Sequence, residues 1–470
     1  MGATRGSTAK VGVFGIGLEA YWSQFDGLRE RLEGYRRHVE EQLGRWAQVV
    51  SPGLVDTAPK AYAAGERFAE ERVDLIFCHA ATYATSSQVL LAVQEVNVPV
   101  VVLNLQPVSA LDYEAADTGE WLANCSACCV PEISNAFERA DIPFNVVSGM
   151  LYGDEEAWRE IEEWCSAANV VRTLRGSRFG FLGHTYPGML DMYSDFTMHH
   201  AQLWLHVEIL EMDDLKDHVD NTPDAAVVAK AEEARETFEL DESVQGKSLD
   251  WAARVSAGLD ALVEDAELDA LAYYYGGTNG SFYEQLGAGL ILGNSLLTAR
   301  GVPASGEGDL KNAVAMKIMD TLGAGGSFTE FYAMDFDENF LLMGHDGPGH
   351  VAISDRKPVL RELDIYHGKA GGGVSVEFSV KTGPVTIFAV TQTRDGRLKM
   401  MAAEGESLPG PTLSIGNTNS RLRFSLPPAE FMNAWCQHGP THHCALGTGH
   451  QVGVLGKVAR LLGLEFVEVG

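Results

Sequence analysis

The stretch DLIFCHAATYATSSQVLLAVQEVNVPVVVLNL (residues 74–105) contains a complete strand–helix–strand unit. Residues 74–80 and 98–105 are short apolar runs rich in Val, Ile and Leu, which is typical of strands buried on both faces of a sheet. Residues 86–97 between them have the spacing of a helix, so the chain crosses over from one strand to the next. This pattern predicts parallel strands in a sheet that is covered by helices.

The same alternation of apolar runs and helical patterns extends from residue 11 to residue 176. Additional strands are predicted at 11–17 and 46–52 and within 135–149, and additional helices at 27–43, 61–72 and 157–176. Repeated βαβ units indicate a doubly wound sheet. We therefore predict a flavodoxin-like α/β domain for residues 1–173.

The pattern of apolar residues changes twice after this domain. A second α/β unit begins at SRFGFLGHT (177–185), with strands at 203–210 and 268–276 and helices near 225–237 and 249–264. After Gly325 the stretch HGKAGGGVSVEFSVKTGPVTIFAVTQT (367–393) is alternating and β-branched, which is typical of an antiparallel barrel or sandwich. A helix near 454–463 closes the chain. The predicted fold is α/β, with two parallel-sheet α/β domains (1–173 and 174–324) followed by a mainly antiparallel β domain (325–470).

Composition excludes several classes of partner. The net charge of −30, from 65 acidic and 35 basic residues, argues against binding to nucleic acid, which requires a basic surface. No apolar run is long enough to span a bilayer, and the start of the chain, MGATRGSTAK, lacks the apolar core of a signal peptide. Seven scattered cysteines suit a reducing compartment. We expect a cytoplasmic protein that binds neither nucleic acid nor membrane.

Three motifs resemble cofactor or metal sites but lack the context that such sites need. GIGLEA (15–20) fits the dinucleotide fingerprint, but the next helical pattern begins only near Gly27 and could not hold a pyrophosphate at its start. CSACC (125–129) has no second cysteine pair to complete a zinc site, so its thiols are expected to pack in the core. Of His199 and His200, which are adjacent, at most one is expected to serve as a ligand.

A different set of carboxylates and imidazoles lies in glycine-rich loops of the second half. Each residue taken singly is more often a solvated glutamate or a hydrogen-bonded loop histidine. Together they form a credible oxygen and nitrogen site for a divalent metal such as Mn²⁺, Mg²⁺ or Co²⁺. The candidates are Glu307 in SGEGD (305–309), Glu330 in GGSFTEFY (325–332), His345 and His350 in MGHDGPGH (343–350), and His442 and His443 in GPTHHCALGTGH (439–450). Cys444 is not needed as a ligand.

Four of these motifs, in this order, resemble the L-arabinose isomerase and L-fucose isomerase superfamily. They are GEGDLKNA (306–313), GGSFTEFY (325–332), the His345 loop and GPTHHCAL (439–446). Looser similarity at 101–107, 146–158 and 177–183 extends the resemblance over nearly the whole chain. In two places the chain departs from arabinose isomerases: it has GIGLEAYW (15–22) after the first strand, and QPVSA (106–110) where they have a Thr-Ala-His-Gly-Gly segment. The departures affect the sugar-reading surface rather than the metal centre.

The resemblance implies a role for each candidate residue. Glu307, Glu330, His345 and His443 would hold a divalent metal, with Mn²⁺ the first choice. Glu307 and Glu330 would also be the catalytic acid and base. His442 and Asp309 would lie on the substrate side, where Asp309 would also orient a ligand. The family is usually hexameric, and a neighbour's N-terminal domain completes each active site.

The implied activity is the metal-dependent interconversion of an aldose and a ketose. The substrate would be a pentose, hexose or deoxyhexose of the L-arabinose or L-fucose type, and the reaction would pass through an enediolate stabilised by the metal. A hydride shift is the other possible route. Two rivals remain at this stage: a non-catalytic sugar-binding protein, and a metal-dependent hydrolase or lyase acting on a sugar derivative.

The adjacent histidines carry one further geometric expectation. Neighbouring side chains on an extended segment point to opposite sides. We therefore expect His443 to face the metal, and His442 to face away from it toward the substrate.

Overall fold

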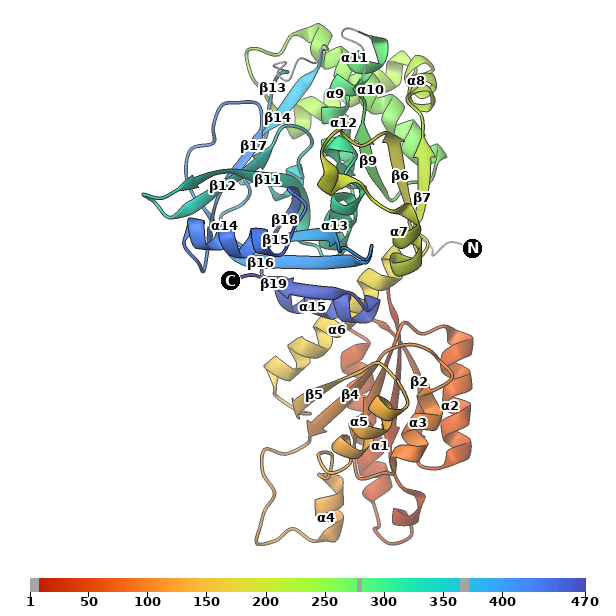
Figure 1. Cartoon of the computed structure of the whole chain (residues 1–470). Coiled ribbons are helices and arrows are strands. Elements are labelled where there is room, and N and C mark those ends of the chain that lie inside the picture. The colour runs from red at the N-terminus through yellow and green to blue at the C-terminus, as the bar shows by residue number, and fades with distance from the viewer. Residues whose placement is uncertain (1–7, 277–280, 364–371) are drawn as a thin grey trace. The chain divides into compact units, whose positions relative to one another are not determined.

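The computed structural model describes residues 8–276, 281–363 and 372–470 (Figure 1). The chain divides into two units, of which one ends at Arg172 and the other begins at Thr173. The predicted three-domain boundaries stay predictions. Most of the N-terminal segment and the first five residues of the predicted stretch 367–393 lie outside the described residues.

The first unit is a five-stranded parallel sheet flanked by helices (Figure 1). The strand order 2-1-3-4-5 is that of the flavodoxin-like doubly wound fold. The strands are β1 (Lys10–Ile16), β2 (Gln48–Val55), β3 (Leu75–His79), β4 (Val100–Gln106) and β5 (Phe144–Met150). The helices are α1 (Leu28–Leu43), α2 (Ala58–Glu71), α3 (Ser86–Val93), α4 (Thr118–Ala123), α5 (Val130–Arg139) and α6 (Glu155–Leu174). The parallel sheet predicted from the apolar runs is confirmed.

The glycine turn after β1 does not open an α-helix. A single 3-10 turn, η1 (Glu19–Tyr21), follows it, and α1 begins at Leu28 after Gly27, whose φ of 80° is left-handed. The helix start that we expected near Gly27 is therefore confirmed.

The second unit begins with a four-stranded parallel sheet in the order β10-β9-β6-β7. Its strands are β6 (Arg178–Gly183), β7 (His206–Leu210), β9 (Ala270–Tyr274) and β10 (Ala304–Ser305). Its helices are α7 (Phe196–Leu203), α8 (Met212–Asp220), α9 (Asp224–Thr237), α10 (Gly246–Asp265), α11 (Phe282–Ala288), α12 (Leu290–Ala299) and α13 (Leu310–Thr321).

The predicted strand 203–210 is too long. Residues up to Leu203 belong to α7. This helix starts after Asp195, whose carboxylate accepts hydrogen bonds from the backbone N–H groups of Thr197 and Met198. Trp204 then ends the helix in the left-handed conformation. The strand β7 starts only at His206.

Six antiparallel strands of the second unit close into a barrel, because β15 and β16 pair directly as well as through the rest of the sheet. They are β11 (Gly325–Asp335), β12 (Phe340–His345), β15 (Gly383–Gln392), β16 (Leu398–Leu408), β17 (Thr418–Phe424) and β18 (Cys444–Thr448). The expected antiparallel β part is confirmed, and of barrel and sandwich the structure has the barrel.

Smaller elements surround the barrel. β19 (Glu465–Glu468) pairs in parallel with β16, and a three-stranded sheet has the order β14-β13-β8. That sheet joins β13 (Val359–Glu362) and β14 (Val374–Glu377) to β8 (Glu239–Leu240). The remaining helices are α14 (Pro428–Gln437) and α15 (Val452–Leu462). In the described part of the chain, no helix combines the length and apolarity that crossing a bilayer requires.

Helix α13 connects the parallel sheet to the barrel. Residues 310–319 are all buried, because the helix packs against β9 on one side and against β11, β15 and β18 on the other (Figure 1). A helix buried on all sides is a rigid support. The loop that precedes it, residues 306–309, is thereby fixed beside the barrel strands.

Candidate metal centre

Glu307 has a backbone conformation that its two glycine neighbours make possible. Its φ of 60° is left-handed, which is uncommon for a residue with a side chain and is found often at functional sites. A Cβ atom on Gly306 would lie 2.8 Å from the Phe328 ring, and one on Gly308 would lie 2.6 Å from the carbonyl oxygen of His184. The GEG sequence is therefore required by close packing on both sides of the glutamate.

Glu330 and His345 are brought together by the pairing of β11 and β12. Glu330 lies opposite Gly344 in this antiparallel pair, next to His345 at the end of β12. The Nε2 atom of His345 lies 4.0 Å from a carboxylate oxygen of Glu330. The other ring nitrogen, Nδ1, donates a hydrogen bond of 2.8 Å to the carbonyl oxygen of Asp346.

His443 is held from the start of α13. Its Nδ1 donates a 3.1 Å hydrogen bond to the Asp309 carboxylate, and both side chains are fully buried. The same carboxylate caps α13 by accepting from the backbone N–H of Asn312. Asp309 thus has the geometry of a residue that orients a ligand, whereas a contact between Asp309 and a substrate stays a prediction.

The imidazoles of His345 and His443 face each other through their Nε2 atoms. The Nε2 atoms of His345 and His443 are 3.1 Å apart. Because a carbonyl and a carboxylate can only accept, the protons lie on the two Nδ1 atoms and both Nε2 atoms are acceptors. Burial lowers the pKa of His345 to about 3, so this imidazole is neutral at neutral pH. Two facing Nε2 acceptors are an arrangement that a cation bound between or beside them would stabilise.

The four candidate ligands have the dimensions of a metal site. Glu307 Oε2 lies 3.7 Å from His443 Nε2, and this oxygen is buried with no hydrogen-bond partner in the described structure. Adjacent ligands at right angles, each about 2.1 Å from an ion, are separated by about 3 Å. Two overlapping triads lie within 4.8 Å: Glu307, His442 and His443, and Glu330, His345 and His443. The donor set fits a hard or borderline divalent ion.

The two glutamates differ in their protonation equilibria. Burial raises the pKa of Glu330 above its ordinary value, with the neighbouring histidines opposing this shift. Burial acts in the same direction on Glu307, but His442, whose Nε2 lies 3.8 Å from the carboxylate, and the neighbouring His345 and His443 lower its pKa overall. Carboxylates shifted in opposite directions are a common basis for dividing acid and base roles.

The expectation that His442 and His443 point to opposite sides is wrong. Their rings are 3.9 Å apart and tilted by 42°, and both Nε2 atoms face Glu307, at 3.8 and 3.7 Å. Strand alternation does not apply here, because His442 lies in a bend and β18 begins only at Cys444. Asp191, which the sequence analysis missed, accepts hydrogen bonds from both the backbone N–H and Nδ1 of His442.

Other residues considered from the sequence lie apart from this cluster. His350 is buried, with Nε2 3.7 Å from Asp320. His199 is buried in α7, with no hydrogen-bond partner for its ring in the described structure. Burial raises the pKa of the Cys444 thiol. The Cys125 and Cys128 sulfurs are in contact at 2.6 Å, and no third possible ligand joins them among the described residues.

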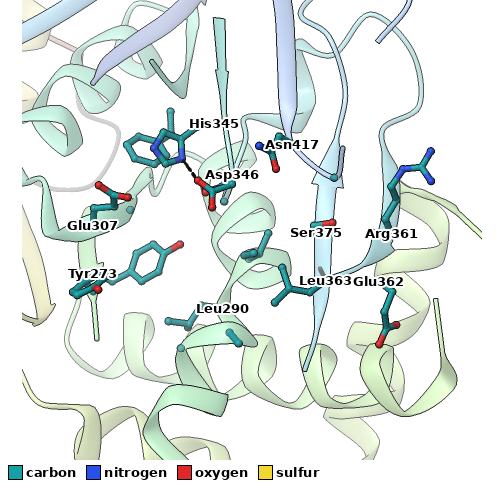
Figure 2. A pocket seen from close by; sticks show the side chains of 18 of the residues that line it. Tyr273, Leu290, Glu307, His345, Asp346, Arg361, Glu362, Leu363, Ser375 and Asn417 are labelled. Carbon is teal, nitrogen blue, oxygen red and sulfur yellow. Dashed lines mark hydrogen bonds and ion pairs between the residues drawn. The ribbon is translucent and has the colours of Figure 1, made fainter. Parts of the chain in front are cut away.

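A cavity of about 310 Å³ opens from the metal ligands (Figure 2). Glu307, His345 and Tyr273 lie at one end, and Arg361 and Glu362 at the other. This volume is at the small end of the range for ligand pockets and matches a small polar molecule.

Comparison with known proteins connects this geometry to a family. The model for the central domain of L-arabinose isomerase matches residues 194–325, and the model for the C-terminal domain of L-fucose isomerase matches residues 350–470. A sulfoquinovose isomerase from Alkalicoccus urumqiensis is 22% identical over 92% of this chain and 95% of its own. The chain belongs to the L-arabinose and L-fucose isomerase superfamily.

Two further relatives of this superfamily member are named L-arabinose isomerase. The protein from Herpetosiphon aurantiacus is 26% identical, over 67% of this chain and 64% of its own. The protein from Aeromonas salmonicida is also 26% identical, over 70% of this chain and 68% of its own. Glu307 and His443 lie inside the two matched domains, whereas Glu330 and His345 lie between them. The family resemblance inferred from the motifs is confirmed.

Proposed function

We propose that this superfamily member is a metal-dependent aldose–ketose isomerase acting on an uncharged pentose, hexose or deoxyhexose. The observation that carries the proposal is the pair of buried imidazole acceptors, 3.1 Å apart, with the Glu307 and Glu330 carboxylates beside them. Glu307, Glu330, His345 and His443 would hold a divalent ion, with Mn²⁺ the first choice. When bound, the ion supplies Lewis-acid stabilisation of the charge that develops on the sugar oxygens.

The chain's own residues supply the proton transfers. An aldose becomes a ketose when the C2 proton moves to C1 and the O2 proton moves to O1, through an enediolate. In this proposal Glu307 and Glu330 carry these protons. Two observations support it: they flank the same cluster, and their pKa values are shifted in opposite directions. His442 faces the same space and would donate a hydrogen bond to a sugar oxygen.

The charge of the cavity favours an uncharged sugar. Arg361 is the one lysine or arginine among the described residues that line it, and its guanidinium is already bound by Asp241 at 2.8 Å and Glu377 at 3.0 Å. A sulfonate or phosphate would therefore meet carboxylates without a free cation to balance them. The acidic residues of the lining are Asp241, Glu284, Glu307, Asp346 and Glu362. We accordingly expect selection against sulfoquinovose, the sulfonated sugar for which several relatives are named.

A panel of sugars tests the proposal. Protein loaded with Mn²⁺ is incubated with L-arabinose, L-fucose, D-arabinose, D-galactose and sulfoquinovose, and ketose is measured with and without a chelator. We expect ketose from at least one uncharged aldose, none from sulfoquinovose, and loss of turnover on chelation. Turnover of sulfoquinovose alone would contradict the uncharged substrate. Ketose formation that survives complete metal removal would contradict the metal.

Assembly and location are proposed on the same basis. The family resemblance supports a hexamer, and the acidic composition and scattered cysteines support a cytoplasmic protein. Sedimentation that shows an active monomer at assay concentration would contradict the hexamer.

A further inference from the structure

Asp191 makes a two-point contact with His442, from which it is 251 positions away in the sequence. One carboxylate oxygen, Oδ2, accepts 2.9 Å from the backbone N–H and 2.7 Å from Nδ1 of His442. A carboxylate can only accept, so Nδ1 carries a proton. The contact therefore fixes both the backbone and the ring of His442, and it turns Nε2 toward Glu307.

The segment that carries Asp191 is anchored by a buried lysine. Lys311 is fully buried, and its ammonium group donates to the carbonyl oxygens of Met192 at 3.0 Å and Tyr193 at 3.3 Å and to the Ser194 hydroxyl at 3.0 Å. Three acceptors match the three N–H bonds of an ammonium group. A buried cation with such partners is costly to displace, so it holds residues 192–194 in place.

Apolar packing adds little to the position of this segment. Leu190, directly before Asp191, and Tyr193, two residues after it, have exposed fractions of 76% and 48%. The 3-10 turn η2 (Leu190–Met192) has one buried residue, Met192. The hydrogen bonds from Lys311 are thus a main constraint on where Asp191 lies.

Both anchors originate in the sequence GEGDLK. Asp309 binds Nδ1 of His443 directly, and Lys311, two residues further on, binds the segment that binds Nδ1 of His442. The start of α13, itself buried between sheet and barrel, therefore sets the orientation of both imidazoles by two separate routes.

We propose that Asp191 is a positioning residue, held by Lys311, that aims the His442 imidazole at the sugar without contributing to the metal. This inference rests on the proposed isomerase function, since His442 is taken to contact the substrate. It separates two roles within one histidine pair: Asp309 serves the metal through His443, and Asp191 serves the sugar through His442.

Kinetics and metal binding test the proposal together. We expect Asp191→Ala to lower kcat/KM by roughly 10- to 100-fold, the size of effect found when a charge-assisted or ligand-orienting hydrogen bond is lost. Its affinity for Mn²⁺, measured by calorimetry on the chelated protein, should stay within about twofold of that of the unaltered protein, because in the proposal Asp191 does not act through the metal. Asp191→Asn keeps an acceptor oxygen and should recover part of the loss. The matched control is Asp195→Asn, which removes a carboxylate that caps α7 in the same segment and should leave both readouts unchanged.

A double-mutant cycle shows whether Asp191 acts through His442. In the His442→Ala background, Asp191→Ala should cause no further loss of kcat/KM, because the group it positions is gone. Additive losses would overturn the proposal, as would equal losses of metal affinity and activity or an Asp191→Ala variant with unaltered kinetics.

A crystal structure of Asp191→Ala gives a readout that does not depend on turnover. We expect the His442 ring to rotate away from Glu307 while His443 stays in place. An unchanged ring would overturn the positioning role even if the protein isomerises sugars. If the ring rotates in Asp191→Ala but the unaltered protein produces no ketose, Asp191 positions His442 as proposed and the proposed isomerase function is refuted. Lys311→Met is the companion variant. In its crystal structure too, we expect the His442 ring to rotate away from Glu307.

Discussion

At the residue scale, the candidate site depends on which nitrogen of each histidine is free. His345 and His443 both donate through Nδ1, so their Nε2 atoms are available as ligands. His442 donates through Nδ1 to Asp191. This hydrogen bond and the nearby Glu307 carboxylate outweigh burial and raise the pKa of His442 to about 10. A histidine that stays protonated makes a poor ligand and a good hydrogen-bond donor to a sugar oxygen.

This difference predicts distinct outcomes for the two adjacent histidines. His443→Ala should weaken Mn²⁺ binding by roughly 10-fold or more, because a ligand is lost rather than a residue that orients one. His442→Ala should keep the metal and lose kcat/KM, because a protonated imidazole has no lone pair to offer an ion. Metal content by mass spectrometry and steady-state kinetics on both variants decide the assignment. If His442→Ala loses metal and His443→Ala retains it, the roles are exchanged.

The sequence identified the ligand candidates but not their orientation. Glu307, Glu330, His345 and His443 stand in motifs that can be recognised from their glycines. Asp191 has no such signal, because its partner is 251 positions away and its own surroundings, GMLDMYS (188–194), form no pattern. The shared direction of His442 and His443 was also missed, because a bend precedes β18 and strand alternation begins only after it.

At the scale of elements, the loop before α13 is the most constrained part of the site. Gly308 has a φ of 72° and no room for a Cβ atom, whereas Gly323, just after α13, has a φ of 74° and nothing within 4 Å of a Cβ position. The two glycines therefore match in φ and differ in packing.

The comparison of Gly308 and Gly323 gives a prediction for the loop. Gly323→Ala should cost about 1–2 kcal/mol of unfolding free energy, the penalty for a left-handed residue, and should keep metal affinity. Gly308→Ala should cost more than this and should also weaken metal binding, because the clash with His184 displaces Glu307. Urea denaturation and calorimetry on the two variants test this. Equal effects of both substitutions would show that packing at Gly308 does not position the glutamate.

Element type was predictable where periodicity was strong. Buried strands such as β3 and β4 follow directly from their apolar runs. The strand predicted at 203–210 was too long, because the apolar residues of LWL (203–205) at the end of α7 merge with those of β7 in the sequence. β8, with two residues, has no pattern to detect and is a strand only because β13 pairs with it.

At the scale of the whole molecule, ligands from separate parts of the chain converge. Glu307 precedes the buried helix α13, while Glu330, His345 and His443 come from three barrel segments. The closure of the barrel by β15 and β16 could not be derived from sequence, because alternation fits a sandwich equally well. The convergence itself therefore required the tertiary structure.

Convergence of two carboxylates predicts that metal stabilises the second unit. Burial raises the pKa of Glu330 and the nearby Glu307 carboxylate adds to this shift, so a bound cation would favour the ionised form of Glu330. Mn²⁺ at 100 times its dissociation constant should raise the unfolding free energy by about 2.7 kcal/mol. Thermal unfolding with and without metal measures this, and Glu330→Gln should reduce the effect. An unfolding temperature that is independent of metal would contradict it.

Acid stability is a separate prediction for the first unit. His79, at the end of β3, is 1% exposed with no partner for either ring nitrogen among the described residues, and burial lowers its pKa to about 4. Below pH about 6.5 the His79 imidazole takes up a proton in the unfolded state, whereas in the folded state it does so only near pH 4. The free energy of unfolding is therefore highest above about pH 6.5 and falls as the pH is lowered toward about 4. The loss should approach about 3 kcal/mol below pH 4. In His79→Phe this slope should be absent, as read by hydrogen exchange of β3 after correction for intrinsic rates. A slope that persists in His79→Phe would assign the acid sensitivity to other groups.

Return of Mn²⁺ to chelated protein decides whether the isomerase depends on this metal site. Mn²⁺ is titrated into metal-free protein while ketose formation from the preferred uncharged aldose is followed. We expect no turnover without metal and a linear rise to a plateau at one ion per chain. Full turnover before any ion is added, or a plateau that persists when Glu330 and His345 are both replaced by Ala, would contradict it.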